Sequence, residues 1–268
     1  MVLLLGGDQV ARTREGRALT AALDLSSGTE LAAQAARDSP DAAQRVRLRK
    51  ACIWGWMQDL AGRDPDVTGQ LVVPGAGLAP LALDWCATHP RCSAFELDSE
   101  HMDAKRTLIA QCASAAISRR ISCTTCDVRS PQALHERLRA HGWNPQRPAL
   151  WVLEGLSYYI SRDELVALIG CAFAGSPHAK VILEFSGPRE SLTPRARAHT
   201  EQYHQFIAAR IGRLDLEVTD IHQVAEAAGA RVERLVDPAM IEQQYEFPRY
   251  FKSADESAMR LALLSAAR

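Results

Sequence analysis

The residues best suited to chemistry stand at the ends of short apolar segments. Gly75 and Gly77 follow the apolar run 71–73, and Asp98 comes 21 residues after Gly77. Glycine lets a loop turn tightly and lets a ligand approach its backbone. A carboxylate at this spacing can reach the ribose hydroxyls of a bound nucleoside. This stretch therefore predicts a site for a cofactor that contains a nucleoside.

Pro80 bears on which cofactor that is. A dinucleotide-binding fingerprint has glycine or alanine at this position, whereas proline removes an N–H group from the start of the following helix. A pyrophosphate held by helix N-terminal amides is therefore disfavoured. The loop fits a cofactor without phosphates better than it fits NAD.

Two further acids end predicted strands. Asp127 follows the segment 121–125, and Glu154 follows the continuous apolar run 149–153, which is typical of a buried parallel strand. An unpaired buried carboxylate is costly, so Glu154 is hard to explain as a structural residue. Ligands bind outside the carboxyl ends of the strands in parallel sheets, so these acids and the glycine loop predict one pocket.

Apolar strands and helices alternate from about residue 70 onward. The expected strands cover residues 71–73, 93–97, 121–125, 149–153, 180–186, 232–236 and 247–251. Ser161 and Glu164 have the spacing of a capping box, and Thr219 is expected to cap a helix that reaches Gly229. Repeated β-α units predict an α/β fold, a mostly parallel sheet with helices on both faces.

One domain is expected for the 268 residues, because no linker or internal repeat divides them. Within it we expect a helical N-terminal extension, a cofactor-binding core, a substrate lid and a C-terminal part of the sheet. These parts cover residues 1–68, 69–186, 187–215 and 216–268, respectively. The lid is predicted because its segment interrupts the alternation and is rich in arginine, proline, histidine and aromatic residues.

Composition excludes several classes of protein. Hydrophobic residues make up 47% of the chain, charged residues 24%, and the formal net charge is −1, so binding to nucleic acid or to a membrane surface is not indicated. Seven scattered cysteines indicate reduced thiols. The apolar run 2–5 is too short for a signal peptide and no segment approaches the roughly 20 apolar residues that span a bilayer, so a cytoplasmic protein is expected. Cys123 and Cys126 form a single C-x-x-C without the further ligands that zinc needs, so no metal site is expected.

Several segments together resemble the leucine carboxyl methyltransferase family. They are VVPGAGLAPLALDW, AFELDSEHMDAKR, the turn Asp127-Val128-Arg129 and LEGLSYYIS, within residues 42–186. Members of this family are class I S-adenosylmethionine-dependent methyltransferases. The resemblance implies a Rossmann-like class I methyltransferase fold with a mostly parallel seven-stranded sheet, and S-adenosyl-L-methionine as the cofactor. It also implies a small-molecule methyl acceptor, because the family includes bacterial O-methyltransferases of secondary metabolism.

The resemblance also assigns roles in binding the cofactor. The loop residues that it places under the methionine part are Gly75, Ala76 and Gly77. Asp98 is implied to bind the ribose hydroxyls, with Glu96, one step earlier on the same strand face, as the alternative.

For the adenine, the resemblance implies Asp127 and Val128. Glu154 would pair with the ammonium group of the cofactor, and an arginine of the N-terminal region would bind its carboxylate. Arg49 is preferred to Arg47 for that role. Where family members often have Asp and Arg after the glycine loop, this chain has residues 79–82, Ala-Pro-Leu-Ala.

The expected reaction is methyl transfer to a carboxylate or hydroxyl oxygen of a small molecule. Candidate acceptor-site residues, none of them singled out as a base, are Tyr158, Tyr159, His199, Tyr203 and His204. Transfer to sulfur or nitrogen, an NAD-dependent oxidoreductase and a non-catalytic cofactor-binding protein remain alternatives. The pattern does not determine the oligomeric state.

Overall fold

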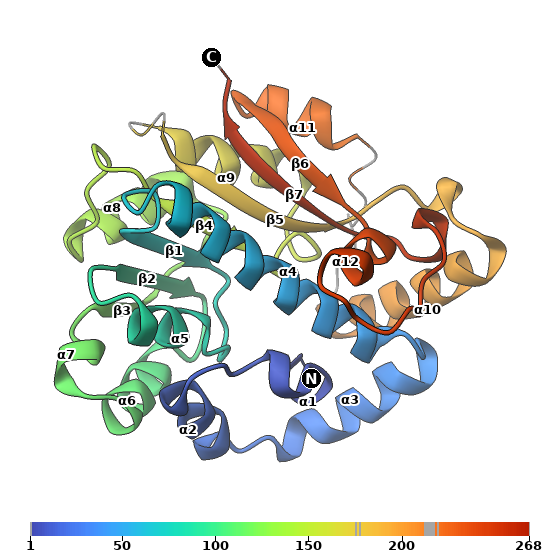
Figure 1. Ribbon diagram of the computed structural model, residues 1–268, viewed down its shortest axis with the longest axis horizontal. Coiled ribbons are helices and arrows are strands. Elements are labelled where there is room, and N and C mark those ends of the chain that lie inside the picture. Colours follow the sequence, from blue (N-terminus) through green and yellow to red (C-terminus); the bar gives the residue numbers. More distant parts are fainter. Residues whose placement is uncertain (1, 175, 177, 212–217, 219, 268) are drawn as a thin grey trace.

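One seven-stranded sheet forms the centre of the molecule (Figure 1). The computed structural model describes residues 2–174, 176, 178–211, 218 and 220–267. The strands are β1 (Gln70–Pro74), β2 (Ser93–Asp98), β3 (Ile121–Thr125), β4 (Leu150–Leu153), β5 (Lys180–Ser186), β6 (Ala230–Val236) and β7 (Met259–Ala266). Their order is β3-β2-β1-β4-β5-β7-β6, with β7 antiparallel to both neighbours and the other pairings parallel. The mostly parallel seven-stranded sheet was predicted correctly.

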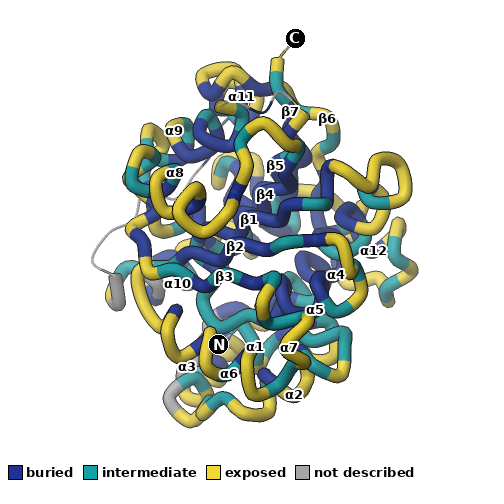
Figure 2. The backbone as a smooth tube through the Cα atoms, turned by 90° about the vertical axis from the view of Figure 1, so that its left-hand side faces the viewer, coloured by how far each residue is buried: buried dark blue, intermediate teal, exposed yellow. Residues whose placement is uncertain are grey.

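Helices cover both faces of this sheet. On one face lie α4 (Ala42–Arg63), α5 (Leu81–Thr88), α6 (Met102–Cys112) and α12 (Pro238–Gln244), and on the other α8 (Pro131–Ala140), α9 (Arg162–Phe173) and α11 (Ile221–Ala227). Alternate side chains of a strand enter different cores: Leu150 and Val152 pack with α4, whereas Trp151 and Leu153 pack with α9. The central strands are accordingly buried between layers with exposed outer surfaces, whereas the edge strands β3 and β6 are partly exposed (Figure 2).

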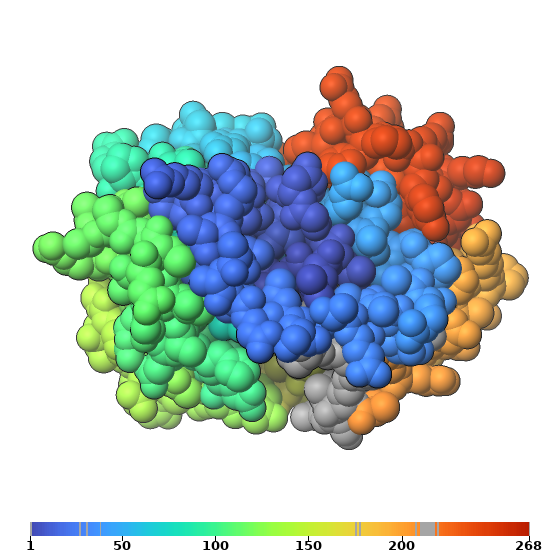
Figure 3. All heavy atoms as spheres, turned by 90° about the horizontal axis from the view of Figure 1, so that it is seen from below, coloured from blue at the N-terminus to red at the C-terminus, as the bar shows by residue number. Residues whose placement is uncertain are grey.

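The N-terminal residues are helical, as predicted. They form α1 (Val2–Leu5), the 3₁₀ turn η1 (Gly7–Gln9), α2 (Arg14–Ala22) and α3 (Ser26–Asp38). Seen from below, these residues make a blue band across the molecule (Figure 3). Within the predicted lid, η2 (Arg189–Ser191) and α10 (Pro194–Ile211) form, and α10 packs against α3. Residues 212–215 of that segment lie outside the described residues.

The capping box at Ser161 and Glu164 is confirmed, since each side chain hydrogen-bonds the backbone of the other. Asp220 caps α11 by accepting from His222 N at 2.8 Å, while Thr219 lies outside the described residues. No described helix has the length and apolar character needed to span a membrane. All seven cysteines are free thiols. The short remaining helices are α7 (Ala115–Ser118) and the 3₁₀ turn η3 (Ala254–Glu256).

The strand predicted for residues 247–251 is wrong. This segment has no regular structure, and the backbone amides of Tyr250 and Phe251 donate to the Glu242 carboxylate, each at 2.9 Å. The last strand is β7 instead, which inserts between β5 and β6. An aromatic segment can thus be buried, as Phe251 is, without pairing in a sheet.

Candidate active site

A cavity of about 770 Å³ lies at the carboxyl ends of β1, β2 and β4. Pockets for small ligands commonly measure roughly 300 to 1,000 Å³. The strand order reverses between β1 and β4, so the cavity occupies the topological switch point at which α/β sheets bind ligands. Val2 and Leu3 of α1, and Leu25 just before α3, also line it, so the N-terminal region forms part of its wall. We call this space the first cavity.

The glycine loop forms one wall of the first cavity. Gly75 and Gly77 both have positive φ angles, +68° and +48°, which residues other than glycine rarely adopt. A Cβ on Gly75 would also lie 3.0 Å from Leu156 Cδ1. The backbone amides of Gly75 and Ala76 donate to Leu97 O, at 2.7 and 3.2 Å, which ties the loop to β2.

Asp98 ends β2 beside this loop. Its Oδ2 accepts a hydrogen bond from Gly77 N at 2.8 Å, and its Oδ1 accepts one from Ser99 N at 2.7 Å. A carboxylate has about four acceptor positions, so it can accept further bonds from a ligand. Glu96 also lines the cavity but is buried and ion-paired with Lys105 Nζ at 2.7 Å. Asp98 is therefore the more accessible of the two predicted ribose ligands.

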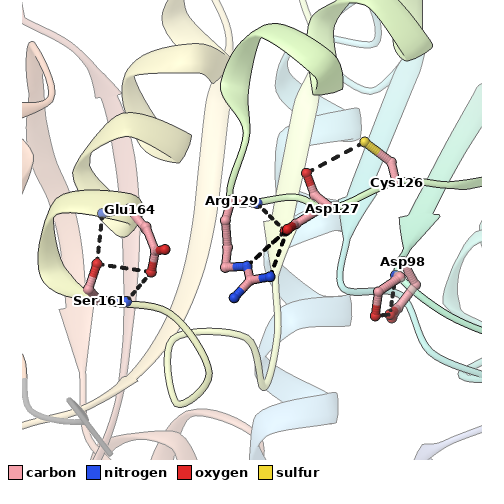
Figure 4. Close-up of polar contacts among 7 residues, drawn as sticks. Asp98, Cys126, Asp127, Arg129, Ser161 and Glu164 are labelled. Carbon is pink, nitrogen blue, oxygen red and sulfur yellow. Dashed lines mark hydrogen bonds and ion pairs between the residues drawn. The ribbon is translucent and has the colours of Figure 1, made fainter. Parts of the chain in front are cut away.

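Asp127 lies on the turn after β3, with Val128 and Arg129, and all three line the first cavity. Arg129 binds the carboxylate through two nitrogens, Nε to Oδ1 at 2.9 Å and Nη2 to Oδ2 at 2.7 Å (Figure 4). These hydrogen bonds hold the pKa of Asp127 below its ordinary value. Asp127 therefore faces the cavity as an anion whose orientation Arg129 sets.

Four buried charges form what we call the charge cluster: Arg49, Lys50, Glu154 and Glu184. Glu154 Oε1 lies 2.9 Å from Arg49 Nε, and Glu154 Oε2 lies 2.8 Å from Lys50 Nζ. Arg49 Nη1 lies 3.4 Å from Glu184 Oε2. Two cations and two carboxylates balance, so the cluster as a whole is neutral.

Strand alternation explains why this cluster forms. Glu184 shares its sheet face with Ile182, and Glu154 follows Leu150 and Val152 at even spacing. These apolar residues pack in the same core as α4. The acids therefore face α4, which lies across this face of the sheet (Figure 1) and whose sequence supplies Arg49 and Lys50.

Burial opposes every charge in the cluster, and the partners decide which groups stay charged. Burial alone would raise the pKa of Glu154, but Lys50 and Arg49 lower it below its usual value. Burial likewise works to lower the pKa of Arg49, but Glu184 and Glu154 raise it further than burial lowers it. The pKa of Lys50 is lowered by burial, which Glu154 only partly offsets. Glu154 and Arg49 are thus held as ions.

Two atoms of the charge cluster make no hydrogen bond among the described residues. Arg49 Nε and Glu154 Oε1 are buried and ion-paired, but neither is in hydrogen-bonding geometry with a partner. Buried polar groups without hydrogen bonds are uncommon and point to a missing ligand or solvent. The α-amino-acid end of a ligand carries an acceptor carboxylate and a donor ammonium, which are the groups these atoms lack. The residues present therefore fit an amino-acid-bearing cofactor.

A second cavity, of about 40 Å³, lies next to the first, and Arg49 lines both. It lies between α4, α10 and the end of β5. Of the predicted acceptor-site residues, Tyr158, Tyr203 and His204 line this second cavity, whereas Tyr159 lines the first. His199 is half-buried on α10 and is not among the described residues lining either cavity.

The aromatic residues of the second cavity are held in place by charged neighbours. Tyr158 Oη donates to Glu184 Oε1 at 2.7 Å, and burial raises the pKa of its hydroxyl well above the ordinary value. Burial, together with the positive charges of Arg189 and Arg45, lowers the pKa of His204 to about 4. His204 is therefore neutral at physiological pH.

Sequence reasoning missed three charged residues of this region: Lys50, Lys105 and Glu184. Lys50 adjoins the predicted Arg49, and Glu184 ends an apolar strand as Glu154 does, so the strand-end pattern could have found Glu184. Lys105 carried no such signal, because a lysine on a helix is usually solvent-exposed. Arg47 lies 3.8 Å from Asp8 and its side chain is 43% exposed, whereas Arg49 lines the first cavity.

The comparisons with solved structures identify the fold. A candidate methyltransferase of Thermobifida fusca YX is 16% identical, with a TM-score of 0.70 over 98% of this chain and 97% of that one. A DUF574 family protein of Streptomyces avermitilis MA-4680 is 14% identical, with a TM-score of 0.69 over 97% and 99%. Mitomycin 7-O-methyltransferase is 13% identical, with a TM-score of 0.51 over 95% and 68%.

The sequence comparisons identify the family. No curated protein matches the chain. The model of the leucine carboxyl methyltransferase family matches residues 8–172, more than half of the chain. This match selects the methyltransferase interpretation over the oxidoreductase one. The chain therefore belongs to the leucine carboxyl methyltransferase family and is an S-adenosylmethionine-dependent methyltransferase.

Proposed function

We propose that this methyltransferase methylates an oxygen atom of a small molecule in secondary metabolism. The observation that carries the proposal is the small second cavity, which adjoins the first across Arg49 and is lined by hydroxyl, phenol and imidazole groups. A space of about 40 Å³ admits part of a small acceptor but not a folded protein surface. The similarity in fold to mitomycin 7-O-methyltransferase agrees with an acceptor of natural-product type.

In this proposal, different residues of the first cavity bind different parts of the cofactor. Asp98 accepts from the ribose hydroxyls, because the charge of Glu96 is already neutralised by Lys105. Asp127 and Val128 bind the adenine, and the loop 75–77 lies under the methionine part.

The charge cluster binds the amino-acid end of the cofactor. Glu154 pairs with the ammonium group, and Arg49 binds the carboxylate, assisted by Lys50, which also lines the first cavity. The neutral cluster accepts a zwitterion without adding net buried charge, which keeps the electrostatic cost of binding low.

When bound, S-adenosylmethionine supplies a methyl group activated by a positively charged sulfur. The protein's part is to hold the acceptor in line with that group and to exclude water. The N-terminal helices, which form part of the wall of the first cavity, and α10, which borders the second, exclude solvent in this proposal. A carboxylate acceptor is already ionised and needs no base, whereas a hydroxyl acceptor needs one, for which neutral His204 lies in the second cavity.

The cofactor assignment is tested by Asp98→Ala. We expect S-adenosylhomocysteine to bind about 1–3 kcal/mol more weakly, because charged hydrogen bonds to a ligand are lost. Asp103→Ala is the matched control, since Asp103 is 80% exposed on α6 and pairs only with Arg106 in the described structure. Calorimetric affinities that are equal for Asp98→Ala and the wild type, with the fold intact, would refute the ribose role.

The acceptor atom is tested by product chemistry. Methyl-labelled S-adenosylmethionine is incubated with a panel of small carboxylic acids, phenols, amines and thiols, and products are identified by mass spectrometry. The products are then treated with base. A methyl ester releases its label as methanol, whereas a methyl ether retains the label. Label found only on nitrogen or sulfur would contradict O-methylation.

A further inference from the structure

We propose that Arg129 is a further cofactor-binding residue, whose guanidinium group donates a hydrogen bond to a ring nitrogen of the adenine. The proposal rests on the proposed function, from which it takes the placement of the adenine at Asp127. Its support comes from three observations: the turn that holds Arg129 at the first cavity, the pairing of its side chain with Asp127, and the hydrogen-bonding groups that this pairing leaves free.

The turn after β3 is tied to the place proposed for the ribose. The backbone amide of Cys126 donates to Asp98 O at 2.8 Å, so the turn begins beside the residue that binds the ribose in the proposal. Ser130 N closes the turn by donating to Asp127 O at 3.2 Å. Asp127 and Arg129 both line the first cavity. Because the adenine is bonded directly to the ribose, a cofactor whose ribose binds Asp98 has its adenine within reach of this turn.

Asp127 and Arg129 form one hydrogen-bonded pair (Figure 4). Three N–H groups of Arg129 donate to the carboxylate: the backbone amide to Oδ1 at 3.0 Å, Nε to Oδ1 at 2.9 Å, and Nη2 to Oδ2 at 2.7 Å. A carboxylate has about four acceptor positions, so these bonds leave about one, on Oδ2. Asp127 therefore has room for a single further donor, which one N–H group of the adenine amine can supply.

The guanidinium group keeps free donors next to that position. An arginine side chain has five N–H donors, and the pair uses only the one on Nε and one on Nη2. Nη1 donates to no residue in the described part of the chain. The side chain of Arg129 is 50% exposed and that of Asp127 is 51% exposed, so a ligand in the first cavity can reach both.

An acceptor beside a donor matches the edge of adenine. The amine of adenine donates, and the ring nitrogens on either side of it, N1 and N7, accept. Asparagine and glutamine recognise adenine in DNA by presenting one acceptor and one donor from the same amide group. Asp127 and Arg129 present this combination from two side chains, because their ion pair holds a carboxylate oxygen next to the guanidinium nitrogens.

The experiment uses the 1-deaza and 7-deaza analogues of S-adenosylhomocysteine, each of which has a C–H group in place of one ring nitrogen. Calorimetry measures the affinities of the wild type and of Arg129→Met for all three compounds. We expect the wild type to bind one of the analogues at least about tenfold more weakly than S-adenosylhomocysteine, because a charged hydrogen bond is lost. In Arg129→Met that difference should vanish, because no guanidinium group remains to donate.

Arg106→Met is the matched control. The side chain of Arg106 is 59% exposed on α6 and pairs with Asp103, but Arg106 is not among the described residues that line the first cavity. This variant should bind all three compounds with wild-type affinity. Both substitutions replace an exposed side chain, so both variants should unfold close to the wild-type temperature, which verifies that the fold is intact.

Two results would overturn the proposal. If Arg129→Met changes the affinities for all three compounds by one common factor, Arg129 does no more than orient Asp127. If the wild type binds both analogues as tightly as S-adenosylhomocysteine, no donor of the protein binds N1 or N7.

Asp127→Ala separates these results from a failure of the proposed function. Unchanged affinity of this variant for S-adenosylhomocysteine would show that the adenine does not lie at Asp127, and the proposed function would then be wrong in placing it there. Weaker binding by Asp127→Ala, together with either of the two results above, would show that only the role of Arg129 fails.

Discussion

Lys50→Met tests the charge cluster most directly, because it removes one cation and keeps the volume of the side chain. Lys50 Nζ lies 2.8 Å from Glu154 Oε2, and both side chains are at least nine-tenths buried. At an effective dielectric constant of about 20, two unit charges at this distance attract by about 6 kcal/mol. Desolvation offsets most of this, and breaking a buried pair commonly costs about 3–5 kcal/mol.

We expect the lower end of this range, about 3 kcal/mol of unfolding free energy at pH 7.5. The reason is that Glu154 keeps Arg49 at 2.9 Å, while the described cluster changes from neutral to one net negative charge. Glu154→Gln alone should cost a similar amount, because it leaves one net positive charge. The double change Lys50→Met with Glu154→Gln restores neutrality and should lie within about 1 kcal/mol of the wild type.

The pH dependence gives an independent check. In the wild type the pKa of Glu154 is lowered, so its contribution to stability is present above the unfolded-state pKa of about 4.3 and is lost as the pH falls through the folded-state value. Lys50→Met raises that folded-state pKa, so protonating Glu154 relieves the excess charge. The stability gap between variant and wild type should therefore be largest above neutral pH and narrow toward pH 4.

Urea denaturation followed by tryptophan fluorescence, at several pH values, measures all four proteins of this cycle. The reasoning is refuted if the double variant loses the sum of the two single losses, or if the gap for Lys50→Met does not change with pH. Affinity for S-adenosylhomocysteine should fall both in Lys50→Met and in the double variant, because each lacks the Lys50 side chain that lines the first cavity. Restoring the neutrality of the charge cluster does not replace that side chain.

Two further predictions concern buried polar groups. The Asp84 carboxylate accepts hydrogen bonds from Arg12 N at 2.9 Å and Thr13 N at 3.0 Å. Asp84→Ala should therefore lower the free energy of unfolding by about 2–3 kcal/mol and speed proteolysis before α2, and Asp84→Asn should lower it less. Equal proteolysis rates for Asp84→Ala and the wild type would contradict this. The pKa of His204 is lowered to about 4 in the folded protein, so protons bind the unfolded state more readily as the pH falls from 6.5 to 4. Over this range the wild type should lose up to about 3 kcal/mol of unfolding free energy relative to His204→Gln. Parallel profiles of unfolding free energy against pH for the two proteins would disprove this.

Local patterns predicted strand ends and a glycine loop whose residues the structure places around the first cavity. The path from Gln70 to Asp98 is one strand-loop-helix-strand unit, so short-range signals suffice to place its glycines and its acid. The continuous apolar run before Glu154 likewise predicted a buried strand that ends just before this acid, and β4 is that strand. The capping box at Ser161 was readable because both of its partners lie within one helical turn.

Strand β7 shows where local patterns fail. Residues 259–266, MRLALLSA, are rich in leucine and alanine and favour a helix when taken alone. They form a strand because β5 and β6 pair with both of their edges, and that pairing outweighs intrinsic propensity. The aromatic segment 247–251 has the composition of a strand, but no such partner pairs with it in the described structure.

The sequence by itself determined the class of sheet, the glycine loop, the acids at the strand ends and the family. Only the tertiary structure decided which charges neutralise one another, because Lys50, Glu154 and Glu184 come from three elements far apart in the chain. It also decided that Ser186 and Thr200 face one small polar space. Strand alternation and helix packing determine these long-range contacts. They cannot be predicted from the sequence around any single one of the residues involved.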